Sequence, residues 1–158
     1  MPRIRRVRLN DSPLAAHLDT MSKDATQAGL DAGFDMRTIE LIRLRASQLN
    51  GCASCLKAHT ALALEHGEIA HRIGMLTAWR DSDYFTPTER AVLELAEIIT
   101  LVGETGYDDD DYTRLAETLT PEQISAASWI AIVINTSNRL WIANNPPVRL
   151  PRNLRREE

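Results

Sequence analysis

The residues of this sequence that could do chemistry are concentrated in the stretch NGCASCLKAHTA, residues 50–61. Cys52 and Cys55 are the only cysteines of the chain, and His59 follows four positions after the second. A Cys-x-x-Cys pair occurs in dithiol–disulfide redox sites and in zinc sites, and two buried cysteines can also be simple packing residues. Taken alone, the stretch is compatible with all three interpretations.

The glycine before the cysteines predicts that one helix ends there and that another begins near Cys52. On that second helix Cys52, Cys55 and His59 share one face, because they are at positions i, i+3 and i+7. Both cysteines then lie in the first turn, where unpaired N–H groups and the helix dipole stabilise a thiolate. His59, one turn beyond Cys55, can accept or relay its proton.

A carboxylate in the preceding helix is expected to join this group. Residues 36–50 form a predicted helix, and a hairpin at the glycine brings the residue level with Glu40 near Leu62, less than one turn from His59. Glu40 is therefore expected to hydrogen-bond His59, directly or through water, as a carboxylate does when it orients a catalytic imidazole. Proton transfer is predicted to run along Glu40, His59 and Cys55, with the other cysteine positioned to close a disulfide.

Two other interpretations of these residues remain open. Two thiolates, an imidazole and a carboxylate can complete a tetrahedral zinc site. Against zinc, the three N- and S-donors come from a single helix, and the sequence has no second Cys-x-x-Cys. The cysteines can also be coincidental packing residues, because free cysteine is commonly buried.

The elements that must position these residues have helical patterns nearly throughout. Ser12 and Asp35 are candidate N-caps, and the stretches TPTE and TPEQ, which begin at Thr86 and Thr120, are typical capping boxes. The predicted helices cover residues 13–30, 36–50, 52–66, 68–79, 87–102, 108–119 and 121–143. Because the short apolar runs lie inside these patterns, no strand is expected. The sequence predicts an all-α fold, a compact bundle of six or seven helices.

Length and pattern predict one domain over residues 1–158, with its core at about 13–143. Basic clusters at the two ends, RIRRVR and RLPRNLRRE, are expected to be solvated arms. The net charge of −4 gives no reason to expect nucleic acid as a partner. The longest apolar run, WIAIVI, is too short to cross a membrane, and no apolar segment follows the basic start. These features predict a cytoplasmic protein, where a Cys-x-x-Cys pair is more often catalytic or metal-binding than structural.

The predicted helix over residues 36–50 is apolar on two sides. Ile39, Ile42, Ala46 and Leu49 form one stripe, and Leu41 and Leu44 form a second stripe on nearly the opposite side. Glu40 and Ser47 lie between the stripes, with Arg43 nearby. A helix of this kind must be covered on both sides, and in so short a chain a second subunit would be a convenient cover. The pattern therefore favours a homo-oligomer.

The four candidate residues have a spacing that is specific in combination, E-x11-C-x-x-C-x-x-x-H, from Glu40 to His59. This spacing resembles that of the AhpD-like alkylhydroperoxidases in the carboxymuconolactone decarboxylase superfamily. The surrounding ELIRLRASQLNGCASCLKAHT is similar to the core of that family, including Ser47 and Asn50. AWRDSDYFTPTERAVLELAE and INTSNRL are similar to the later helices of its small peroxidase-related members, so the resemblance covers residues 13–143. Ser54 departs from it, because many members carry an aromatic residue there, which affects the choice of substrate or partner.

The resemblance implies an all-α subunit that assembles into dimers, trimers or hexamers. It also implies a thiol-dependent peroxidase that uses neither haem nor metal and needs no cofactor. By position, Cys55 would be the peroxidatic cysteine and Cys52 the resolving cysteine, with His59 and Glu40 as the proton relay. The partners would be a hydroperoxide substrate and an external dithiol reductant, lipoyl-type or thioredoxin-like.

Two further functional hypotheses stay open at this point. Lactone decarboxylation gave the superfamily its name, but it does not require a redox pair of cysteines. A non-enzymatic oligomer, either a redox sensor or a zinc-stabilised scaffold, would use the same cysteines without turnover.

Overall fold

The computed structural model describes Ile4, Arg6 and residues 8–150. Within this part of the chain the fold is all-helical, as predicted, and no strand occurs. The α-helices are α1 (Pro13–Asp31), α2 (Met36–Leu49), α3 (Ala53–Glu65), α4 (Ala70–Met75), α5 (Pro87–Thr100), α6 (Val102–Thr105), α7 (Asp109–Ala116) and α8 (Pro121–Asn144). Two 3-10 helices, η1 (Leu9–Asp11) and η2 (Leu76–Asp81), complete them. Most of the two basic clusters that were expected to be terminal arms lies outside the described residues.

The helices begin where the sequence provides caps. Ser12 caps α1 and Asp35 caps α2, each accepting a hydrogen bond from a backbone N–H of the first turn. Thr86 and Thr120 each form a complete capping box with the third residue of their helices, α5 and α8. Each cap satisfies N–H groups that have no partner within the helix, which stabilises a helix start by about 1 kcal/mol. The predicted starts of these four helices are therefore confirmed.

One predicted helix differs in the structure. Residues 68–79, predicted as one helix, form the short helix α4 followed by η2. The change to the tighter 3-10 geometry includes Ala78, whose φ of −121° and ψ of 30° are not helical. The side chains of Leu76 and Trp79 on this segment are buried. The backbone thus departs from a single straight helix in the segment where these two side chains pack into the core.

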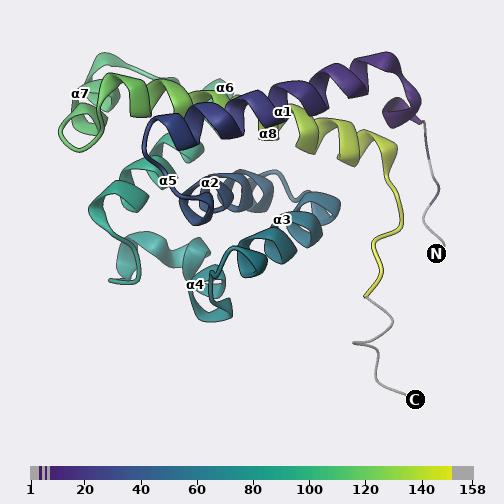
Figure 1. Cartoon of the computed structure of the whole chain (residues 1–158), viewed down its shortest axis with the longest axis horizontal. Helices are drawn as coiled ribbons and strands as arrows, with labels where there is room; N and C mark the ends of the chain where they lie inside the picture. The colour runs from purple at the N-terminus through teal and green to yellow at the C-terminus, as the bar shows by residue number, and fades with distance from the viewer. Residues whose placement is uncertain (1–3, 5, 7, 151–158) are drawn as a thin grey trace.

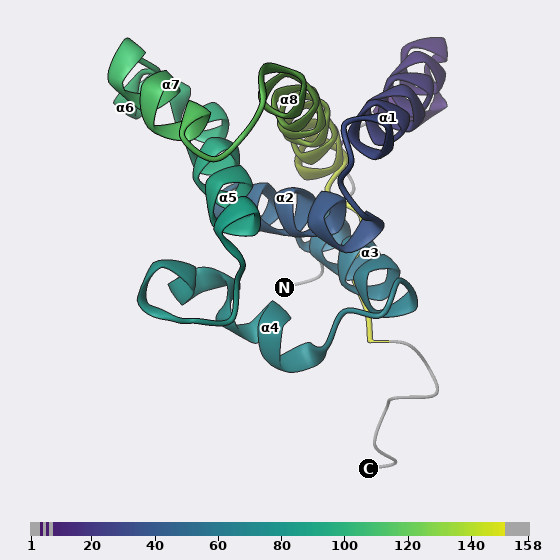
Figure 2. The same cartoon turned by 60° about the vertical axis from the view of Figure 1, so that its left-hand side comes forward.

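Helix α2 lies in the middle of the molecule, with α1 and α8 on one side, α3 and α4 on the other, and α5 next to it (Figures 1 and 2). Ile39 and Ile42, from its first apolar stripe, belong to a core cluster that includes residues of α1, α5 and α8 such as Ala25, Val92 and Ile130. Leu41 and Leu44, from the second stripe, belong to another cluster, which includes Ala63, Trp79 and Leu93. Both sides of α2 are therefore covered by its own chain. The prediction that a second subunit provides one cover is wrong.

Helices α1 and α8 run antiparallel and side by side along one edge of the molecule (Figure 1). Gly29 of α1 permits the close approach of the two helices, because a β-carbon there would lie 2.9 Å from Cδ1 of Ile130 on α8. The segment before α1 is tied to the end of α8, since the backbone N–H of Leu9 donates to Oδ1 of Asn144 at 2.7 Å. The helix pair thus forms a wall beside α2 and α3, which carry the candidate site.

Candidate active site

The candidate site is built on the hairpin of α2 and α3. Gly51 forms the turn with a positive φ of 64°, a conformation that glycine adopts without strain. Cys52 is the N-cap of α3, and Cys55 lies in its first turn. The backbone N–H of Cys52 donates to the carbonyl of Ser47 at 3.0 Å, which fixes the start of α3 against the end of α2. The predicted helix start near Cys52 is confirmed, with Cys52 as the cap itself.

Cys52 and Cys55 are joined by a disulfide with an S–S distance of 2.14 Å. Sγ of Cys52 also accepts a hydrogen bond from the backbone N–H of Cys55 at 3.3 Å. This N–H is one of the donors that a helix start leaves without a backbone partner, so it favours negative charge on the sulfur when the pair is reduced. Both cysteines are nearly inaccessible, with exposed fractions of 1% and 4%. The disulfide is therefore shielded from solvent.

Glu40 and His59 meet as the hairpin geometry predicts. Oε2 of Glu40 lies 2.7 Å from Nδ1 of His59, a direct hydrogen bond between α2 and α3. Because the carboxylate occupies Nδ1, Nε2 is the ring nitrogen left to exchange a proton. The Glu40 side chain is fully buried, and the His59 side chain is 17% exposed. The imidazole thus connects a buried carboxylate with the surface of the site.

A third residue, which was not predicted as part of the site, holds the other oxygen of Glu40. Nη1 of Arg43 donates to Oε1 of Glu40 at 2.7 Å, and Nη2 donates to Oγ1 of Thr26 on α1 at 2.6 Å. Arg43 is itself buried. The signal available in the sequence is the i, i+3 spacing of Arg43 and Glu40 on one helix. The contact with α1 is not visible in that spacing.

The surroundings of Glu40 act on its pKa in opposite directions. Burial of the carboxylate would raise its pKa, because a charge in the protein interior loses hydration. The hydrogen bond from His59, followed by the charges of His59 and Arg43, outweighs burial and holds the pKa of Glu40 below its ordinary value. Glu40 is therefore ionised at neutral pH and can stabilise a protonated imidazole.

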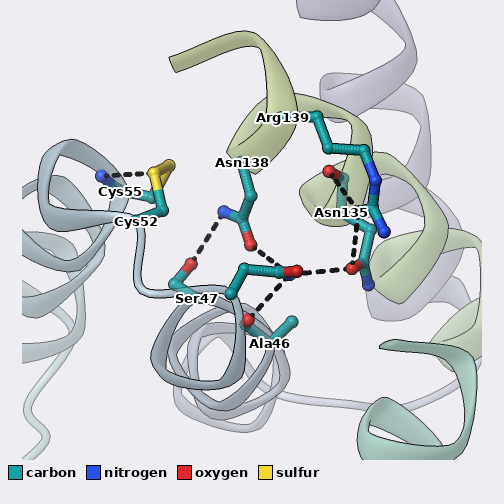
Figure 3. Close-up of a disulfide and its surroundings, with 8 residues drawn as sticks. Ala46, Ser47, Cys52, Cys55, Asn135, Asn138 and Arg139 are labelled. Atoms are coloured by element: carbon teal, nitrogen blue, oxygen red, sulfur yellow. Dashed lines mark hydrogen bonds between the residues drawn. A yellow bond between two sulfur atoms is a disulfide. The ribbon is translucent and has the colours of Figure 1, made fainter. Parts of the chain in front are cut away.

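A buried amide network supports the turn that carries Cys52 (Figure 3). Nδ2 of Asn138 on α8 donates to Oγ of Ser47 at 3.0 Å. Nδ2 of Asn50, next to the turn, donates to the Oδ1 atoms of Asn135 and Asn138 at 2.8 and 2.9 Å. Ser47 and Asn138 are fully buried, so each of these groups needs the partner that it has. The network fastens the end of α2 to α8 directly beside the disulfide.

Two cavities adjoin the disulfide, one at each cysteine. A cavity of about 630 Å³ lies between α1, α3 and α8 and is lined by Cys55 and His59 among others. A smaller cavity of about 180 Å³ lies at the start of α3 and the end of α8 and is lined by Cys52. Ser54 and Trp141 line both cavities. Cys55, and not Cys52, thus shares a cavity with the imidazole.

A metal site and a membrane span each require a particular arrangement of residues. Among the described residues no three His, Cys, Asp or Glu side chains are placed to hold a metal ion together. In that part of the chain no helix is both long and apolar enough to span a bilayer.

Comparisons with known proteins agree with this architecture. Residues 13–97 match the Carboxymuconolactone decarboxylase family. The uncharacterized protein YdfG of Bacillus subtilis (strain 168) is 43% identical over 106 residues, which are 67% of this chain and 72% of that protein.

A crystal structure gives the corresponding similarity in three dimensions. It is that of a protein of unknown function from Agrobacterium tumefaciens, provisionally described as the antioxidant defence protein AhpD. The two structures superpose with a TM-score of 0.80 at 29% sequence identity, covering 94% of this chain and 100% of the other. The family match spans α1 to most of α5 and therefore contains the whole hairpin with its four predicted residues. The chain belongs to the carboxymuconolactone decarboxylase family and has the AhpD-like fold.

Proposed function

We propose that this protein is a thiol-dependent peroxidase that reduces hydroperoxides through Cys55 and Cys52, with Glu40 and His59 as the proton relay. The observation that carries the proposal is that Cys55 shares a cavity with His59, whose Nδ1 is bonded to a buried carboxylate. A thiolate next to an imidazole that can exchange protons is the arrangement that activates a cysteine as a nucleophile. The proposed place for the hydroperoxide is this cavity of about 630 Å³, which Cys55 and His59 line.

The proposed oxidation consumes one hydroperoxide. His59 accepts the proton of Cys55, and the thiolate attacks the terminal oxygen of ROOH. An S–O bond forms, the O–O bond breaks, and the alkoxide leaves as ROH with the proton from the imidazole. The Cys52 thiolate then attacks the sulfenic acid of Cys55, which forms the disulfide and releases hydroxide as water. Two thiols are oxidised and one hydroperoxide is reduced.

An external dithiol completes the cycle. Its first thiolate attacks the disulfide and forms a mixed disulfide, and its second thiol displaces the protein sulfur and closes the disulfide of the reductant. The proposed reductant is lipoyl-type or thioredoxin-like, and the proposed site of action is the reducing cytoplasm. We further propose that one domain with a core over residues 13–143 acts as a homo-oligomer.

Lactone decarboxylation, the activity in the family's name, is less well supported by the site. A decarboxylase has no use for two cysteines that form a disulfide beside a Glu–His pair. A redox sensor would undergo the same oxidation once and would lack rapid turnover. The distinction between a peroxidase and a sensor therefore rests on reduction by a partner.

Steady-state hydroperoxide consumption, measured with a panel of reductants that includes dihydrolipoamide and thioredoxin, tests the proposal. We expect continuous turnover with at least one dithiol and none with Cys55→Ser. Consumption that stops after one equivalent with every reductant would favour the sensor. An absence of any consumption by the fully reduced protein would overturn the proposal.

A further inference from the structure

The two cysteines of the disulfide line different cavities. The larger cavity contains Cys55 and does not contain Cys52, while the smaller cavity contains Cys52 and does not contain Cys55. In thiol–disulfide exchange the nucleophile approaches one sulfur and expels the other. A nucleophile in the smaller cavity therefore meets Cys52 and expels Cys55.

The two cavities differ in the charged side chains that line them. The smaller cavity is lined by Arg6 and by amide side chains, Asn50 and Asn145. The larger cavity is lined by a carboxylate, Asp19, on α1, and by the imidazole of His59 on α3. The attacking species in disulfide reduction is a thiolate anion, which a guanidinium attracts and a carboxylate repels. The guanidinium of Arg6 thus favours entry of a thiolate reductant from the side of Cys52.

The leaving sulfur also has a stabilising group in this direction. Cys55 shares its cavity with His59, and a protonated imidazole held by Glu40 stabilises the Cys55 thiolate as it is expelled. Cys52 leaves later, when the mixed disulfide is resolved. At that stage its sulfur accepts the Cys55 backbone N–H at the start of α3. Each sulfur therefore has a stabilising group for the step in which it leaves as a thiolate.

From these contacts we propose that the smaller cavity is the reductant site, and that a thiolate of a small dithiol enters it and attacks Sγ of Cys52. The inference rests on the proposed function and adds to it the sulfur that is attacked and the side of entry. The bond from the reductant sulfur to Cys52 forms as the Cys52–Cys55 bond breaks and Cys55 takes the electron pair. The second thiolate of the reductant then attacks the reductant sulfur in the mixed disulfide, which releases the Cys52 thiolate. The cavity volume and the 1% exposure of Cys52 suit a thiol on a slender, flexible arm.

Mapping of the mixed disulfide tests this directly in the wild-type protein. The disulfide is formed with diamide, so the experiment does not depend on hydroperoxide chemistry. A brief exposure to 2-mercaptoethanol is stopped with acid, free thiols are alkylated, and the peptides are analysed by mass spectrometry. We expect the mercaptoethanol adduct on Cys52 and the alkyl group on Cys55 in most singly modified molecules. An adduct mainly on Cys55 would overturn the inference, while the proposed peroxidase activity would stand or fall on its own assay.

Two substitutions on α8 provide a matched pair, because Ile142 lines only the smaller cavity and Leu140 only the larger one. The rate constants for oxidation by cumene hydroperoxide and for reduction by dithiothreitol are measured separately for each variant. We expect Ile142→Trp to lower the rate constant of reduction several-fold more than that of oxidation, and Leu140→Trp to do the reverse. If the ratio of the reduction rate constant to the oxidation rate constant changes in the same direction in both variants, this would contradict entry of the reductant and the hydroperoxide through separate cavities. Thermal unfolding of both proteins checks that they fold, and the mapping above does not depend on either variant.

Discussion

Glu40 connects the two hairpin helices and α1 although its side chain has no contact with solvent. One oxygen binds His59, and the other binds Arg43, which reaches Thr26 of α1. A buried carboxylate is tolerated only with such partners, because an unpaired charge in the interior is strongly destabilising. The same ionic bonds that make Glu40 stable in the core also orient the imidazole for proton transfer.

Removal of either member of the relay is expected to make the reduced protein less reactive near neutral pH. Glu40→Gln removes the carboxylate that supports the imidazole, and His59→Gln removes the proton acceptor of the Cys55 thiol. The rate of alkylation by iodoacetamide, measured against pH, should shift to higher pH in both variants. His66→Gln, at the exposed end of α3, is the matched control. An unchanged profile in both relay variants would exclude Glu40 and His59 from activation of the thiol.

Arg43 is expected to affect both the free energy of unfolding and the dependence of that free energy on pH. Because the pKa of Glu40 is lowered in the folded protein, its stabilisation is complete above the ordinary value of 4.5 and is lost as pH falls through the lower folded pKa. Arg43→Met removes one cause of the lowering, so the stability that is lost on acidification should be smaller and its loss complete at a higher pH. At pH 7 the variant should lose about 3–5 kcal/mol of unfolding free energy, the cost of leaving a buried charge without its partner.

Urea denaturation of the Arg43 variants from pH 7 to well below the ordinary carboxyl pKa of 4.5 measures this effect. Arg43→Lys keeps the charge without the two-pronged contact and is expected to lie between the wild type and Arg43→Met. Equal stability of Arg43→Met and wild type at all pH values would show that Arg43 does not support Glu40.

At the scale of elements, the sequence predicts the helices whose ends are marked by local signals such as caps and turn glycines. Caps and the glycine at residue 51 place α2 and α3, and the hairpin alone brings Glu40 to His59. The short helix α6 and the change from α4 to η2 were not predicted. Four residues are too few to show a period, and the bend at Ala78 lies where side chains of the segment pack into the core. The contacts of Arg43 with α1 and of Asn138 with Ser47 depend on helix packing, which a single sequence does not encode locally.

Truncation of Asn138 is expected to weaken the contact between α2 and α8. Asn138→Ala leaves Oγ of Ser47 without its donor and Nδ2 of Asn50 without one of its acceptors, both beside the turn of Cys52. Unsatisfied buried polar groups cost about 1–3 kcal/mol each, so the unfolding free energy should fall by that order. Thr136→Ala, on the exposed side of the same helix, is the control. Chemical denaturation measures both, and equal stability of the two variants would contradict the proposed support of the turn.

At the scale of the whole molecule, the chain covers both sides of α2 without a partner. The sequence argument for an oligomer from this helix is therefore wrong, because α3 and η2 provide the second cover. Large apolar side chains remain exposed elsewhere, on the pair of α1 and α8. They include Met21, Trp129, Ile132 and Trp141, with exposed fractions of 43%, 51%, 40% and 37%. Exposed apolar side chains of this size can contact another protein.

The wild-type protein is accordingly expected to be a homo-oligomer. Light scattering after size exclusion should give a mass that is a multiple of 17.7 kDa. Trp129→Glu should lower that mass, because a buried unpaired carboxylate destabilises an interface. Ile69→Glu, exposed between α3 and α4, should leave it unchanged. A wild-type mass of one chain would contradict the expectation.

The most direct test of the central claim is a thiol titration of the reduced protein before and after one equivalent of hydroperoxide. Both cysteine thiols should disappear, with a new intramolecular disulfide between Cys52 and Cys55. Cys52→Ser should still consume one equivalent and retain a sulfenic acid, whereas Cys55→Ser should consume none. Thiol counts that do not change would contradict hydroperoxide reduction by this pair. Oxidation that Cys52→Ser blocks and Cys55→Ser permits would reverse the roles of the two cysteines.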